Sequence, residues 1–284
     1  MKRRRLTRRR ILDLLVYAIL ILLAVIWLIP VFFLIVHSFR AEPGAAIRYI
    51  FPKAYTLDNY TRLFTETQLF NFPRWYKNTL IVSAASCVIS TAYVLMISYA
   101  FSRLRFRGRG ALMKAGLVLN MFPGFMSMIA VYFILKAVGL TQSLIALILV
   151  YSGASALTYY VAKGFFDTIP RALDEAAHID GASKSTIFWR ITLPLSRPII
   201  VYTILMSFMA PWMDYIFASV IMKDNYDSYT VALGLFQMIS RENIYDYFTM
   251  FCAGAVLVAV PISLLFLFLQ RYYVEGITGG AVKG

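Results

Sequence analysis

The stretch LLVYAILILLAVIWLIPVFFLIV, from Leu14 to Val36, contains no charged residue. It is longer than the roughly 18 apolar residues that an α-helix needs to cross the hydrocarbon core of a bilayer. The composition of the whole chain is also strongly apolar, because 60% of its 284 residues are hydrophobic and only 15% are charged. A water-soluble domain of this length has too little interior for so many apolar side chains. The sequence therefore predicts an integral membrane protein.

Further uncharged runs of spanning length follow along the chain, and we expect six transmembrane helices in all. The other runs are 79–101, 115–135, 137–162 and 248–270, together with 198–222, which is interrupted only by Asp214. A transmembrane β-barrel would show alternating strands of about ten residues. Because lipid offers the backbone no hydrogen-bond partner, the predicted fold is all-α, with one domain over residues 1–284.

Basic residues gather at one set of helix ends and predict the orientation of the chain. Lysine and arginine near helix ends are retained on the cytoplasmic side of a membrane. They are concentrated in four segments, namely 1–12, the connection 103–114, the loop 164–197 and the C-terminal tail 271–284. We therefore expect these segments and both termini in the cytoplasm. The long loop 38–77, rich in proline and aromatic residues, is then expected outside as a small ordered lobe.

Charge and motif content exclude several functions. The net charge of +14 is explained by these basic flanks and by the lipid bilayer they meet, so nucleic acid is not an expected partner. The chain contains no G-x-x-x-x-G-K-[ST] loop to hold ATP phosphates. It also shows no cluster with metal-ligand spacing and no nucleophile with a matching base. We expect no catalytic residue, metal or cofactor in this chain.

A polar stretch, EAAHIDGASKSTIFWRITLPLSRP from Glu175 to Pro198, lies between two apolar runs. It predicts two short helices joined by a turn at Gly181, because glycine takes a positive φ without steric strain. Ser183 is expected to cap the second helix. Pro194 is expected to end that helix, and Pro198 to open the next transmembrane helix.

Two roles for this helix-turn-helix remain open from the residues alone. Leu173, Ala176 and Ala177 form an apolar stripe, with carboxylates elsewhere around the helix. Such a rigid knob would suit docking in a cleft of a soluble partner. The alternative is an amphipathic loop lying on lipid headgroups, although such loops are usually rich in Lys and Arg. Here the acids Asp167, Asp174, Glu175 and Asp180 nearly balance the basic residues.

The same stretch resembles the signature loop of ATP-binding-cassette importer permeases. The residues that match that pattern are Glu175, Ala176, Ala177, Asp180, Gly181, Ala182, Phe188, Ile191, Leu193, Pro194 and Pro198. Three further stretches, 163–177, 208–219 and 269–284, are similar to the smaller permease subunit of maltose-type importers, which handle maltodextrins and related oligosaccharides. The resemblance covers most of the chain from about residue 30 onward.

This resemblance implies a type I importer permease in a bacterial or archaeal plasma (inner) membrane, forming half of a translocation pathway. The expected partners are a second permease subunit, two ATPase subunits that bind ATP and Mg, and an external sugar-binding protein. The coupling loop, residues 164–197, would seat in a cleft of a cytoplasmic ATPase subunit. The tail residues Glu275, Gly276, Gly279 and Gly280 would contact the ATPase dimer through a flexible backbone. A disordered terminus is the alternative for this tail.

Asp214 is the one ionised side chain expected inside a span. A carboxylate there costs roughly 3 kcal/mol unless it faces the bundle or water, so we expect it to face inward. It could accept hydrogen bonds from sugar hydroxyls, with Phe208, Trp212 and Tyr215 beside it in the pathway, or form a polar contact between helices, which we favour. The rival functions are a proton-coupled transporter using Asp214, a membrane-embedded enzyme, and the same importer type for a non-sugar solute.

Overall fold

The computed structural model describes residues 2–45, 49, 51–122, 124–153 and 156–281. Within these residues every regular element is helical, and one isolated antiparallel β-bridge joins Arg40 and Tyr55. The all-α prediction is confirmed for the described chain.

Three helices are continuous and are long and apolar enough to cross a membrane by length and composition. They are α1 (Lys2–Ser38), α3 (Phe72–Arg103) and α14 (Ile244–Ala281). They contain the predicted spans 14–36, 79–101 and 248–270. Helix α3 begins at Phe72 and therefore includes residues 72–77 of the segment predicted as an external loop.

Within the described residues, three pairs of helices also pass this test together, each bent by more than 40° at a short break. The first pair is α4 (Arg109–Asn120) with α5 (Gly124–Ala137), and the second is α6 (Leu144–Ser152) with α7 (Ala156–Asp167). In the third, α11 (Arg197–Met213) follows the helical stretch Lys184–Leu195 at 81°. The number of spans is six only if each bent pair counts as one.

The prediction of one helix over 198–222 is wrong. Helix α11 ends at Met213, and α12 (Ile216–Met222) starts after Asp214 and Tyr215. The Asp214 carboxylate accepts a hydrogen bond from the backbone N–H of Phe217 at 2.9 Å. A side chain that bonds a first-turn N–H favours the start of a new helix. The interruption of the apolar run at Asp214 marks the position of this break.

The chain divides into two compact units. Unit 1 comprises Met1–Phe70 and Gln237–Leu257, and unit 2 comprises Asn71–Phe236 and Val258–Gly284. In unit 1 the segment after α1 is held by Asn59 on α2 (Asp58–Thr65), whose Nδ2 donates to the carbonyls of Ser38 and Arg40 at 3.0 and 2.7 Å.

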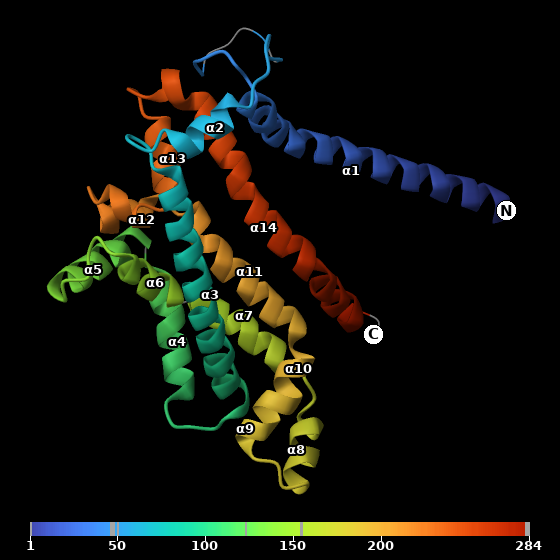
Figure 1. The fold of residues 1–284 in the computed structure, drawn as a ribbon. Helices are drawn as coiled ribbons and strands as arrows, with labels where there is room; N and C mark the ends of the chain where they lie inside the picture. Colours follow the sequence, from blue (N-terminus) through green and yellow to red (C-terminus); the bar gives the residue numbers. More distant parts are fainter. Residues whose placement is uncertain (1, 46–48, 50, 123, 154–155, 282–284) are drawn as a thin grey trace. The chain divides into compact units, whose positions relative to one another are not determined.

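In unit 2, α3 packs along α6, α7 and α11 (Figure 1). Its packing face carries small buried residues. Ser90 Oγ accepts a hydrogen bond from Ser207 Oγ at 3.2 Å, and Ser98 Oγ donates to the carbonyl of Tyr159 at 3.0 Å. Small residues allow close approach of helix backbones in lipid, and α3 is therefore the central helix of this unit.

The C-terminal tail is helical as far as the structure describes it. Helix α14 continues to Ala281, so Glu275, Gly276, Gly279 and Gly280 lie in helical backbone rather than in the flexible end expected from their glycines. Residues 282–284 lie outside the described part of the chain. The role of the tail stays a prediction.

Candidate functional site

The coupling loop folds as two short helices at the end of unit 2 where α3 ends and α4 begins (Figure 1). Helix α8 (Arg171–Ile179) is followed by a turn and by α9 (Lys184–Ile187). Gly181 in the turn has a φ of +82°, and a Cβ placed there would meet nothing within 4 Å. Glycine is therefore favoured here by conformation and not by crowding. Ser183 Oγ accepts from the backbone N–H of Thr186 at 3.1 Å, so both the predicted turn and the predicted cap are confirmed.

The prediction that Pro194 ends the second helix is wrong. Helix α9 passes into a π-helical turn, η1 (Phe188–Thr192), and then into α10 (Leu193–Leu195). The N–H of Leu193 bonds to the carbonyl of Phe188, five residues back, and Pro194, which has no N–H to donate, sits in the first turn of α10. The break comes at Ser196, and Pro198 lies in the first turn of α11 as predicted.

Phe188 anchors the loop to the bundle. Its side chain is only 7% exposed, and its ring centroid lies 4.8 Å from that of Tyr99 on α3. The core cluster around it consists of Val94, Leu95, Tyr99, Ala162, Phe166, Ile169, Phe188 and Ile199. The aromatic position of the signature is therefore a structural anchor in this chain.

Arg103, the last residue of α3, ties three elements together. Its Nη2 donates to the carbonyls of Phe166 and Ile169 at 3.0 and 2.7 Å, at the end of α7. Its Nε lies 3.3 Å from the Asp174 carboxylate on α8, and its side chain is only 5% exposed. Sequence reasoning missed this role, because Arg103 was counted only among the basic residues that set orientation. The sequence offers one indication of this role, an acidic residue, Asp174, in the polar loop where an ion-pair partner for Arg103 could lie.

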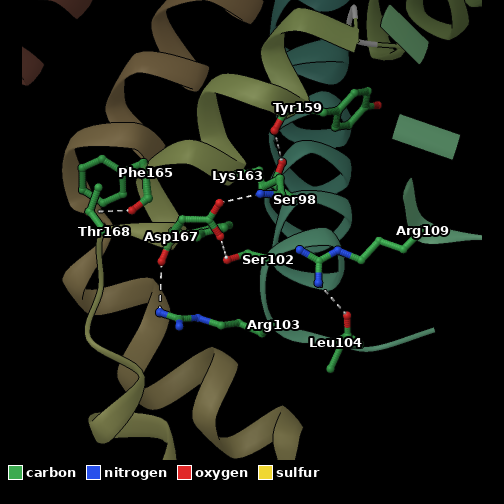
Figure 2. A network of polar contacts seen from close by, with 11 residues as sticks. Ser98, Ser102, Arg103, Leu104, Arg109, Tyr159, Lys163, Phe165, Asp167 and Thr168 are labelled. Carbon is green, nitrogen blue, oxygen red and sulfur yellow. Dashed lines mark hydrogen bonds and ion pairs between the residues drawn. The ribbon is translucent and has the colours of Figure 1, made fainter. Parts of the chain in front are cut away.

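A second polar contact holds the end of α7 against α3 (Figure 2). Ser102 Oγ donates to the Asp167 carboxylate at 2.6 Å, and Lys163 forms an ion pair with the other carboxylate oxygen of Asp167. Two of the four acids that balance the basic residues of this loop, Asp167 and Asp174, are thus engaged within the chain. Glu175 and Asp180 remain exposed.

Several apolar side chains of the loop are exposed. Ile179 is 87% exposed and Trp189 is 61% exposed. Leu173 and Ala176, from the predicted stripe, are also exposed, so that stripe is not covered by the chain's own helices. Apolar groups gathered on a surface mark a site of interaction.

The residues proposed for a substrate pathway make contacts within the chain, and their role in a pathway stays a prediction. Tyr151 donates its hydroxyl to the Asp214 carboxylate at 2.7 Å, which makes a polar contact between α6 and the α11–α12 break. Trp212 is buried, with its ring 5.2 Å from Tyr76 and 6.0 Å from Phe208. The ring of Tyr215 stacks instead on Phe236, with centroids 4.0 Å apart. No three His, Cys, Asp or Glu side chains gather as metal ligands in the described chain.

The family described as binding-protein-dependent transport system inner membrane component matches residues 94–279, which include the whole coupling loop. The chain belongs to this family. It is 36% identical over 278 residues to the galactooligosaccharide transport permease GanQ of Bacillus subtilis, covering 98% of each chain. It is 35% identical over 279 residues to the maltodextrin permease MdxG of the same organism, covering 98% of this chain and 99% of that one.

One further relative and two solved structures are also similar to this chain. The maltose/maltodextrin permease MalG of Escherichia coli is 37% identical over 216 residues, covering 74% of this chain and 72% of MalG. A bacterial ABC transporter that imports the acidic polysaccharide alginate has a chain that superposes with a TM-score of 0.77 at 22% identity, covering 93% of this chain and 97% of that chain. A methionine ABC transporter superposes less closely, with a TM-score of 0.55 at 17% identity, covering 72% of this chain and 95% of that chain. The fold is therefore that of an ABC importer permease, and it is shared by importers of different solutes.

Proposed function

We propose that this chain is a membrane-spanning permease subunit of an ATP-driven importer of oligosaccharides in the plasma (inner) membrane. It would form half of the translocation pathway, with both termini and the coupling loop in the cytoplasm. The identity of 35–36% over nearly the whole chain to maltodextrin and galactooligosaccharide permeases supports the sugar class.

The geometry of the coupling loop is the observation that carries the mechanism. It is fixed to α3 and α7 through Phe188 and Arg103, whereas Ala176, Ile179 and Trp189 are exposed. A partner that gripped these exposed residues would move the ends of α3 and α7 with it. The loop thus has the two contacts that a mechanical link needs, one made within the chain and one open to a partner.

The proposed partners rest on the similarity to ABC importers. An ATPase subunit would receive the coupling loop in a cleft, and ATP with Mg would be bound on that subunit. A second permease subunit would complete the pathway, a second ATPase subunit would serve it, and an external sugar-binding protein would deliver the solute. Glu275, Gly276, Gly279 and Gly280 in the tail would add a second contact with the ATPase subunits.

The test is a charge reversal on the exposed side of the loop. Glu175→Lys should leave the subunit inserted and folded but lower co-purification of the ATPase subunit about tenfold or more, because like charges set across an interface cost several kcal/mol. Glu242→Lys is the matched control, since Glu242 is equally exposed but lies in unit 1. If Glu175→Lys vesicles assembled and transported normally, the coupling role would be lost.

The energy source and the solute need separate measurements. Uptake into proteoliposomes should require ATP on the cytoplasmic side and should continue when the proton gradient is collapsed. Uptake driven by a proton gradient without ATP would support instead the transporter based on Asp214. Competition between labelled maltodextrin, galactooligosaccharide and a non-sugar solute of similar size would then establish the solute class.

A further inference from the structure

A cavity of about 440 Å³ lies between α3, α4 and α7 of unit 2. Its walls are mainly apolar, with Ile97 and Phe101 from α3 and Leu112 and Met113 from α4. Helix α7 contributes two tyrosines and Lys163. The lining includes no residue of α8, α9 or the α11–α12 break.

The cavity adjoins the basic connection that follows α3. On α4 it is lined at Met113, Gly116 and Asn120, positions three or four residues apart that share one face of a helix. The same face reaches Arg109 one turn earlier, at the first residue of α4. Lys163 on α7 lies on the cavity wall itself. An apolar space therefore has cationic side chains at its loop end.

Charge at this end is not balanced. The carboxylate of Asp167 accepts from Ser102 and pairs with Lys163 (Figure 2). The guanidinium of Arg109 makes a 3.5 Å contact with the carbonyl of Leu104, and no described carboxylate lies within 4 Å of it. Asp167 is thus paired with Lys163, and Arg109 has no carboxylate partner among the described residues, which leaves a net positive charge for a ligand.

This combination selects a particular chemistry. A sugar or a small soluble anion would leave most of the apolar wall uncovered. An amphiphile with a negatively charged head would cover the apolar wall with its chain and place its charge beside the cationic side chains. Basic pockets between transmembrane helices on the cytoplasmic side bind anionic lipid headgroups. Arginine is well suited to a phosphate, because its planar guanidinium can form two parallel hydrogen bonds with it.

We propose that this cavity binds an anionic phospholipid, with an acyl chain along α3, α4 and α7 and the phosphate at Arg109 and Lys163. The choice of leaflet rests on the proposed function, since the orientation given there places the basic connection in the cytoplasm and the lipid in the inner leaflet. The bound lipid would hold α4 against α7 next to Asp167, at the base of the coupling loop.

The test uses the purified full chain in nanodiscs of phosphatidylcholine. A few per cent of phosphatidylglycerol, or of phosphatidylcholine with the same chains, carries a photoactivatable diazirine in the acyl chain, and labelled peptides are mapped by mass spectrometry. Peptides from 112–120 and 159–163 should be labelled about fivefold more by the anionic lipid, the ratio expected when one lysine or arginine acts on an anionic headgroup. Equal labelling by the two lipids would overturn the proposal.

Matched variants separate the headgroup site from the acyl site. Arg109→Gln should remove the preference for the anionic lipid, whereas Arg107→Gln, an exposed arginine of the same connection, should retain it. Gly116→Phe should fill the cavity and abolish labelling by both lipids, whereas Ala115→Phe, an exposed neighbour outside the lining, should not. An anionic preference that survives Arg109→Gln would contradict the proposal even if Gly116→Phe failed to fold.

The same labelling is repeated on the assembled transporter. Retention of the label supports the proposal, and its loss on assembly would mean that another protein chain covers the cavity, which overturns it. Labelling needs neither ATP nor sugar. It can therefore fail while ATP-driven uptake proceeds, and uptake can fail while labelling persists, so the two proposals are tested separately.

Discussion

The two ends of unit 2 are held in different ways. At the end where α3 begins, polar side chains of α3 fix the loop between α12 and α13 (Val231–Met238). Trp75 Nε1 donates to the carbonyl of Tyr226 at 3.2 Å, and Asn78 donates to the carbonyls of Asp227 and Tyr229 at 2.9 and 3.0 Å. Trp75 and Asn78 are both buried, so this end is closed by contacts within the chain.

At the opposite end, the coupling loop is fixed on one side only. Phe188 and Arg103 attach it to the bundle, whereas Ile179 and Trp189 are mostly exposed. The end where α3 begins can therefore be stable by itself. The end with the coupling loop keeps exposed apolar side chains that another polypeptide would cover. Substitutions that affect folding should therefore concentrate at the first end, and substitutions that affect assembly at the second.

The largest effect is expected for Gly234→Ala at the closed end. A Cβ at Gly234 would lie 1.9 Å from a carbon of the Trp75 ring. The ring is buried and its Nε1 is hydrogen-bonded, so it has little room to move. We expect a loss of more than about 3 kcal/mol in the free energy of unfolding, seen as a much lower yield and melting temperature in detergent.

The control for this substitution is Gly164→Ala in α7, where a Cβ would meet nothing within 4 Å. It should be neutral or raise stability by up to about 1 kcal/mol, because alanine favours helix more than glycine does. A Gly234→Ala protein that melted like the wild type would show that Trp75 can rearrange and that the closed end is not rigid.

The next effect compares two neighbouring aromatic residues of the coupling loop. Phe188→Ala should lower the free energy of unfolding by about 3 kcal/mol, because it leaves a cavity beside Tyr99. Trp189→Ala, at an exposed site, should change it by less than about 0.5 kcal/mol. For ATPase co-purification from equal amounts of folded protein, Trp189→Ala should have the larger effect. If Trp189→Ala destabilised the isolated subunit as much as Phe188→Ala, the exposed face would not be free for a partner.

Local signals in the sequence predicted most of the loop. Continuous apolar runs predict the long helices, a glycine after an aspartate predicts the turn at Gly181, and a serine before an apolar turn predicts the cap at Ser183. Each of these depends on residues within a few positions of one another. They fold as expected because no distant contact competes with them.

The features that sequence reasoning missed depend on contacts between residues distant in sequence. Asp214 breaks a span by bonding Phe217 and also Tyr151, which lies 63 residues away. Arg103 donates to the backbone carbonyls of Phe166 and Ile169. Every residue has a backbone carbonyl, so no sequence pattern can indicate which ones will accept this hydrogen bond. The orientation of the chain already explains a basic residue at a helix end. The sequence therefore does not indicate that Arg103 also attaches the coupling loop.

An intermediate effect is expected when the Arg103–Asp174 attachment is broken. Arg103→Gln removes the ion pair and weakens the bonds to Phe166 and Ile169, so we expect a loss of about 2 kcal/mol in the free energy of unfolding. Asp174→Asn should lose less, because it leaves the carbonyl bonds in place. In the assembled transporter both variants should keep ATP hydrolysis while uptake per ATP falls.

A double-mutant cycle separates this positioning role from simple stability. If Arg103 and Asp174 act as a pair, the double variant should lose less in uptake per ATP than the sum of the single variants. Strict additivity, or a fall in uptake that matched the fall in folded protein, would argue against a mechanical link between α3 and the coupling loop.

The smallest effect is expected for Asp214→Asn, at the break between α11 and α12. The asparagine carbonyl can still accept from Phe217, and the Tyr151 hydroxyl can accept from the new amide, so stability should change by about 1 kcal/mol or less. Uptake should fall less than in Glu175→Lys. Because asparagine keeps the size of aspartate but not its charge, the variant separates a contact between helices from a carboxylate that binds the solute. A complete block of uptake, with melting temperature and ATPase activity intact, would show that the charge itself acts on the sugar or on an ion.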